Sequence, residues 1–148
     1  MAAIFDLLEL KDELTSYLSS NYENFGTPTF SISEDGSTLS FTFDLTLEGI
    51  DDAILFEVSV SDNGSTICRA FFDVLPKNEY TLNLINDFNC EVFFFKAYIT
   101  KHDGFLVLEN NFICLNIGEV KVTFSYFVNV LGALSFNDLF RKLTLITR

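Results

Sequence analysis

The sequence predicts a single α+β domain over residues 1–148, with helices packed against an antiparallel sheet. Three observations support this class. A helical pattern opens the chain, three or four segments of alternating apolar and polar residues follow it, and two further helical patterns enclose a second pair of strands. Strand–helix–strand alternation and a glycine-rich nucleotide fingerprint are both missing from the sequence. A parallel nucleotide-binding fold is therefore not expected.

Apolar residues three and four positions apart predict the first helix over about residues 3–20, with acidic residues on its other face. Asp6 and Glu9 near its start favour the positive end of the helix dipole. The helix is expected to end near Asn21, because a glycine and a proline follow within seven residues.

The next segments alternate with a period of two, which is typical of strands with one buried face. Between them, the dipeptides Asp35-Gly36 and Asn63-Gly64 supply the positive φ values that tight hairpins need. The predicted strands cover residues 30–32, 39–47, 54–60 and 67–72.

The two hairpin turns have nearly the same text, residues 31–38 and 59–66, and residues 102–104 form a looser third copy. A calcium loop is the alternative interpretation, because acidic residues precede each glycine. An EF-hand needs oxygen ligands of the carboxylate or amide type at its first and third positions and a glutamate at its twelfth. The first copy has serines and a threonine at those places, so we expect recurrent hairpin chemistry and no metal.

The second half of the chain predicts a helix over residues 78–89, with Asn78 as its N-cap. A strand follows over 92–100, where three consecutive phenylalanines suggest burial on both faces. After a turn, the strand 105–108 is expected, and it extends to Ile113 if the pattern continues.

The last helical pattern runs from about residue 119 to 143. Its β-branched and aromatic residues lower the helix propensity, but its length exceeds that of an ordinary strand. Ser135 and Asp138 have the spacing of a capping signal, so Ser135 is expected to start a final helical turn that continues through Arg141.

Composition excludes several functions. Nine basic against 21 acidic residues give a net charge of −12, which repels nucleic acids and anionic membrane surfaces. The first ten residues carry no basic segment of a secretory signal, and the longest uncharged apolar stretch, residues 122–137, is shorter than a membrane span. Three widely spaced cysteines fit neither a disulfide framework nor a zinc site. We expect a cytoplasmic protein with reduced, mostly buried thiols and no cofactor.

Residues 85–89, 96–99 and 102–108 together resemble the YbjN family of bacterial proteins. In that family a helix ends in a similar IN-D-aromatic-N segment, two strands joined by a DG turn follow, and a C-terminal helix closes the chain. The text matches over residues 82–108, and the order of elements matches over most of the chain. The departures are the phenylalanine enrichment and Gly118, which has no second glycine near it.

This resemblance implies a fold like that of type III secretion chaperones, which are small acidic cytoplasmic proteins that commonly form homodimers and bind extended client segments. The YbjN family itself carries the description of a sensory transduction regulator, which implies regulation without a defined reaction. A shared fold does not transfer an activity, so the function must be argued from the residues.

The sequence does not predict an enzyme. The single histidine, His102, lies in an expected hairpin turn without further histidines that could complete a metal site. Cys68 and Cys114 lie in apolar strands, where burial raises the pKa of a thiol. The pair Asp51-Asp52 is expected to solvate a bend.

The asparagines Asn86 and Asn89 are expected to satisfy backbone groups where the helix ends and the next strand begins.

Two functions remain open. The leading hypothesis is a non-enzymatic, homodimeric protein-binding module, chaperone-like or regulatory, with a protein client. Eighteen phenylalanines can exceed what one core hides, although a core that favours Phe explains them equally well. The alternative is a small-molecule sensor with an aromatic cavity between sheet and helices. The expected dimer or partner surface consists of Ile85, Phe88, Phe93, Phe94 and Phe95.

Overall fold

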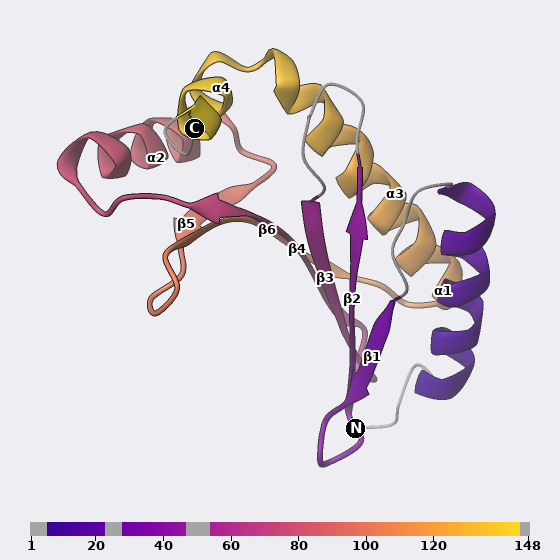
Figure 1. Ribbon diagram of the computed structural model, residues 1–148. Helices are drawn as coiled ribbons and strands as arrows, with labels where there is room; N and C mark the ends of the chain where they lie inside the picture. The colour runs from indigo at the N-terminus through magenta and orange to yellow at the C-terminus, as the bar shows by residue number, and fades with distance from the viewer. Residues whose placement is uncertain (1–5, 23–27, 47–53, 146–148) are drawn as a thin grey trace.

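A computed structural model describes residues 6–22, 28–46 and 54–145 of the chain, and it confirms the α+β class (Figure 1). Four α-helices, one short 3-10 helix and six strands follow each other in nearly the predicted order. They are α1 (Leu7–Asn21), β1 (Thr29–Ile32), β2 (Thr38–Leu45), β3 (Ile54–Ser61), β4 (Ser65–Val74), α2 (Glu79–Glu91), β5 (Lys96–Ile99), β6 (Phe105–Ile113), α3 (Ile117–Ala133), η1 (Leu134–Phe136) and α4 (Asp138–Leu145).

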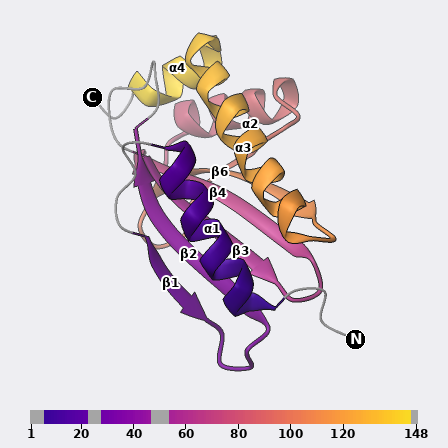
Figure 2. The same ribbon diagram turned by 90° about the vertical axis from the view of Figure 1, so that its right-hand side faces the viewer.

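The six strands form one antiparallel sheet in the order β1-β2-β3-β4-β6-β5. The sheet twists strongly along this order (Figure 1). Helices α1 and α3 lie side by side over its first half, and α2 and α4 lie together toward the other end (Figure 2). Along β2 and β3 every second side chain is buried, as expected for a sheet with helices on one face.

Helix α1 begins one residue after Asp6, whose carboxylate accepts hydrogen bonds from the amides of Leu8 and Glu9 at 3.0 and 3.3 Å. Asp6 has extended backbone angles, as an N-cap does. The prediction placed Asp6 inside the helix, whereas it caps it. The predicted earlier residues of this helix lie outside the described ranges. Four leucines of α1 face the core, namely Leu7, Leu10, Leu14 and Leu18.

The repeated hairpin text has the predicted role. Gly36, Gly64 and Gly104 have φ values of 71°, 96° and 75°, which glycine adopts at little cost. The Asp35 and Asn63 side chains each accept the backbone amide two residues further on, at 3.1 Å. Hydrogen bonds from the hydroxyl groups of Ser33 and Ser37 lower the pKa of Asp35 to about 2. Turn chemistry therefore explains the shared residues.

The predicted strand over 92–100 is too long. Strand β5 covers only Lys96–Ile99, because α2 continues to Glu91 and the Val92 amide still donates to the Phe88 carbonyl at 2.8 Å. The Asn110 side chain donates to the Phe94 carbonyl, and this bond takes the place of a strand ladder there. Burial on both faces is also wrong for this run, because Phe93 is 89% exposed.

The predicted C-terminal helix is divided into three parts. Helix α3 ends at Ala133, η1 follows, and Asn137 has extended backbone angles before α4 begins. The Asn137 side chain accepts the Phe140 amide at 2.9 Å. Asn137 therefore occupies the capping position that the prediction gave to Ser135. The optional extension of β6 to Ile113 is confirmed.

Phenylalanine rings in mutual contact form a cluster within the core. Phe124 of α3 lies 5.5 Å from Phe43 and 6.1 Å from Phe56, measured between ring centroids. Phe127 follows three residues later on the same helix. Its ring lies 6.2 Å from that of Phe56 and 5.2 Å from that of Phe95. Most of these contacts are edge-to-face, which is a favourable arrangement for aromatic pairs. In the described part of the chain, these rings lie between the sheet and the helices, where the sensor hypothesis expected a cavity.

Asn89 closes the outer edge of the sheet at β5. Its side-chain amide donates to the Ala97 carbonyl at 3.0 Å and accepts the Ala97 amide at 2.7 Å. A neighbouring strand would make the same two bonds. The predicted backbone role of Asn89 is thus confirmed, while Asn86 is exposed.

We expect Asn89→Ala to lower the free energy of unfolding by about 1–2 kcal/mol, because both Ala97 backbone groups lose their partner. Urea unfolding followed by circular dichroism measures this. Asn86→Ala is the matched control on the same helix, with a change below about 0.5 kcal/mol. Equal losses in the two variants would contradict the edge-closing role.

Candidate protein-binding surface

The five residues predicted as a dimer or partner surface do not share one surface. Ile85, Phe88 and Phe95 are 6%, 0% and 3% exposed, because they pack within the chain's own core. A second chain cannot reach them without opening that core, so core packing is the correct explanation for these three. Phe94 is half-buried and Phe93 is 89% exposed. Of the five residues, only Phe93 and Phe94 are open to a partner.

A second exposed surface with large apolar side chains lies on α3. We define the outer stripe of α3 as Glu119, Val122, Tyr126, Asn129 and Ala133, all of which are exposed. Val122 and Tyr126 are 69% and 55% exposed, which is high for large apolar side chains. On the opposite side of the helix the core positions are buried, namely Val120, Phe124, Phe127, Val128 and Leu131.

Contacts on both sides of α3 hold the outer stripe in place. On one side α1 packs against α3, where Lys121 pairs with Glu13 at 3.2 Å and the Tyr17 hydroxyl bonds the Ser125 hydroxyl. On the other side the Phe94 ring meets Tyr126 edge-on, with centroids 5.1 Å apart. The outer stripe is therefore a ridge bordered by α1 on one side and by Phe94 on the other. The exposed Phe93 precedes Phe94 in the sequence.

The start of α3 is fixed by reciprocal caps. The Asn116 side chain accepts the Glu119 amide at 2.9 Å, and the Glu119 carboxylate accepts the Leu115 amide. These bonds turn the only charge of the outer stripe toward the helix N-terminus, where a carboxylate is favourable. From Val122 onward the stripe is uncharged.

The sheet face away from the helices carries an ion-pair network. Arg69 of β4 donates to Glu57 at 2.6 Å and to Glu109 at 2.9 Å, from the two neighbouring strands. Burial alone lowers the pKa of Arg69, but the bonds to Glu57 and Glu109 outweigh it and the pKa is raised. Burial, with the Glu109 charge nearby, also raises the pKa of Tyr98. Both carboxylates are taken up by Arg69, so the network is a structural element of the sheet.

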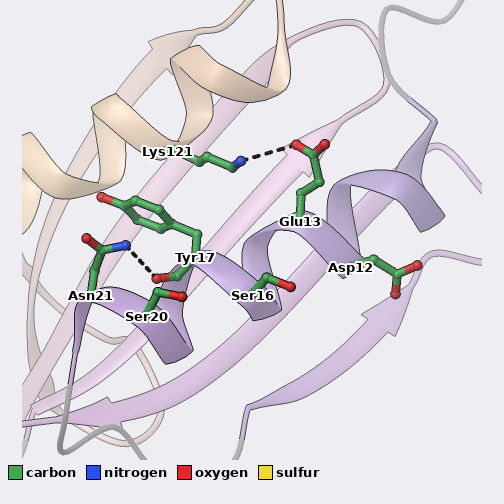
Figure 3. A pocket seen from close by; sticks show the side chains of 7 residues that line it. All are labelled: Asp12, Glu13, Ser16, Tyr17, Ser20, Asn21 and Lys121. Atoms are coloured by element: carbon green, nitrogen blue, oxygen red, sulfur yellow. Dashed lines mark hydrogen bonds and ion pairs between the residues drawn. The ribbon is translucent and has the colours of Figure 1, made fainter.

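A shallow depression lies between α1 and α3, lined by Asp12, Glu13, Ser16, Tyr17, Ser20, Asn21 and Lys121 (Figure 3). Figure 3 shows the Lys121–Glu13 pair spanning it, and the Asn21 side chain donates to the Tyr17 carbonyl. Four of its seven lining residues are thus paired with each other. The depression is open to solvent and lacks the enclosure of a typical small-molecule site.

The histidine and the three cysteines of the described ranges lie in different environments. His102 is exposed in its turn, as predicted. Cys68 and Cys114 are buried, whereas Cys90 is exposed. Burial and then the nearby Cys114 raise the pKa of the Cys68 thiol to about 12, which makes it a poor nucleophile. Within the described ranges, no three His, Cys, Asp or Glu side chains approach each other closely enough to hold a metal ion. Asp51-Asp52 lies outside those ranges.

By length and composition alone, one described segment, Ile117–Phe136, is apolar enough to cross a membrane. About a third of it is buried inside the domain. Its buried positions pack on the sheet through rings such as Phe124 and Phe127. These contacts account for the apolar character of the buried third of the segment.

The outer stripe of α3 was not identified from the sequence. Its signal was present, because residues 122–137 lack charge and the helical period continues through them. Helical spacing alone cannot tell which apolar stripe of such a helix faces the core, since both sides of α3 are apolar.

We compared the chain with family models, with curated proteins and with solved structures, and found no match in any of the three comparisons.

Proposed function

We propose that the chain is a non-enzymatic protein-binding module that acts through the outer stripe of α3 together with Phe93. The observation that carries this proposal is an exposed ridge with the large apolar side chains Val122 and Tyr126, uncharged from Val122 onward, on a chain of net charge −12. Exposed apolar surface of this kind is typical of protein contacts. The ring packing in the core gives no corresponding support to a small-molecule sensor.

A YbjN-like, secretion-chaperone-like fold and a cytoplasmic location belong to the same proposal. The order of a helix, a four-stranded meander, a helix, a two-stranded hairpin and C-terminal helices is the one that the resemblance implies. The acidic composition and the two buried thiols suit a reducing compartment.

Affinity purification from the native host tests the proposed surface. Tyr126→Lys puts a charge on the outer stripe, and Tyr80→Lys is the matched control, because Tyr80 is 60% exposed on α2. We expect wild-type protein and the control to retain the same partners and Tyr126→Lys to lose them. Circular dichroism confirms that both variants are folded. Equal recovery with Tyr126→Lys would reject this surface as the binding site.

A further inference from the structure

The outer stripe of α3 carries no charge beyond Glu119. Residues 122–137 contain no Asp, Glu, Lys, Arg or His, although the chain as a whole carries −12. A basic partner would gain most from acidic surface, which this stripe does not offer beyond Glu119. A second acidic copy meets the least repulsion at an uncharged surface. The charge distribution therefore favours a copy of the same chain as the occupant.

The spacing of the stripe is that of a helix–helix seam. Positions 119, 122, 126, 129 and 133 are separated alternately by three and four residues, which is the repeat along which two helices interlock their side chains. Two antiparallel α3 helices centred between Tyr126 and Asn129 would place Tyr126 of each copy opposite Asn129 of the other. Val122 would then lie opposite Ala133. Two-fold symmetry would repeat each of these pairs, so that each substitution in the stripe acts twice.

Gly132 adds an independent observation. It lies in the last turn of α3 beside Ala133, and a Cβ added there would meet no atom within 4 Å. Its φ is not positive, unlike that of Gly36, Gly64 and Gly104. The monomer thus needs no glycine at this position, and glycine is unfavourable within a helix compared with alanine. A small residue at the border of a seam allows a second helix to approach closely.

We propose that the outer stripe of α3 binds the same stripe of a second copy in an antiparallel, two-fold symmetric contact. This inference rests on the proposed function and names the partner of that surface. One 17-residue helix per copy buries less than the roughly 1,600 Å² of a standard interface. The dimer is therefore weak and depends on protein concentration.

The salt dependence of binding distinguishes a second copy of the chain from a basic partner. Two copies of charge −12 repel each other, and added salt screens that repulsion. Self-association through an uncharged seam should strengthen between about 0.01 M and about 1 M salt, as the screening length falls from ~30 Å to ~3 Å. Binding of a basic protein should weaken over the same range.

Sedimentation velocity of the purified full chain over a concentration series tests the proposal. We expect a monomer–dimer equilibrium whose dissociation constant falls with salt. Tyr126→Lys and Ala133→Lys should each weaken it by about tenfold or more, since symmetry introduces every charge twice. Tyr80→Lys should leave it unchanged. Ala133→Lys guards against a folding defect in Tyr126→Lys, because Tyr126 also contacts Phe94.

Gly132→Ala provides a readout that a purely structural role would not give. It should raise the melting temperature of the dilute protein and at the same time weaken the dimer. A strict monomer at all salt concentrations would overturn the inference, as would a dimer that neither lysine variant weakens. If the monomer still captures another protein through Tyr126, the proposed function holds and only the second copy as partner is rejected.

Discussion

Replacing Phe124 by alanine is expected to lower the free energy of unfolding by about 3–5 kcal/mol. Phe124 is 1% exposed and its ring meets three others, those of Tyr22, Phe43 and Phe56. It therefore joins α3 to two strands and to the end of α1. Since whole domains are stable by only about 5–15 kcal/mol, this loss would remove a large part of the total.

Urea unfolding followed by circular dichroism provides the measurement for Phe124→Ala, and Phe136→Ala is its control. Phe136 is 85% exposed, so the same truncation there should change stability by less than about 0.5 kcal/mol. A loss below about 1 kcal/mol in Phe124→Ala would mean that the ring cluster is loosely packed or collapses around the cavity.

The second large effect is expected at Arg69. Arg69→Met should lower the free energy of unfolding by about 2–3 kcal/mol, because Glu57 and Glu109 would face each other across β4 without a cation. Glu109 is the more affected of the two, since its side chain is only 12% exposed. The loss lies below that of a fully buried pair because Arg69 itself is 25% exposed.

Two further variants identify the cause. Glu109→Gln in the Arg69→Met background should recover part of the loss, because it removes the less exposed of the two uncompensated charges. Lys121→Met breaks the Lys121–Glu13 pair, whose side chains are 30% and 43% exposed, and should cost less than about 1 kcal/mol. If Arg69→Met costs no more than Lys121→Met, the network behaves as an ordinary surface ion pair.

Local signals allowed the first half of the fold to be predicted well. Strict alternation along residues 39–45 and 54–60, with glycine-containing turns between strands, determines both the strands and their buried face. Asn78 was also identified as an N-cap and does accept a backbone amide, that of Thr81. In these cases residues close in sequence decide the structure.

The errors arose where distant residues decide. Phe93, Phe94 and Phe95 read as one buried strand, but the Asn110 side chain binds the Phe94 carbonyl and only Phe95 enters the core. The sequence of residues 92–95 gives no indication that Asn110 binds the Phe94 carbonyl. Tertiary contact therefore overrides local propensity at this point.

The candidate surface was misplaced for a related reason. Ile85, Phe88 and Phe93 are all large and apolar, and composition does not distinguish which of them the helices cover. The choice depends on how α2 is rotated against β5, which Asn89 fixes through Ala97. That contact joins α2 to β5 across eight residues. The sequence therefore predicted that Asn89 binds backbone groups, but not which ones.

The closure of β5 by Asn89 also limits how the protein can assemble. A sheet with two open edges can add copies at both ends and grow into a fibre, in the way that exposed edges promote aggregation. With Asn89 holding Ala97, an added strand cannot pair with the outward backbone groups of Ala97, which disfavours growth at the β5 edge. A single carboxamide on a helix thus competes with an incoming strand for the same backbone groups.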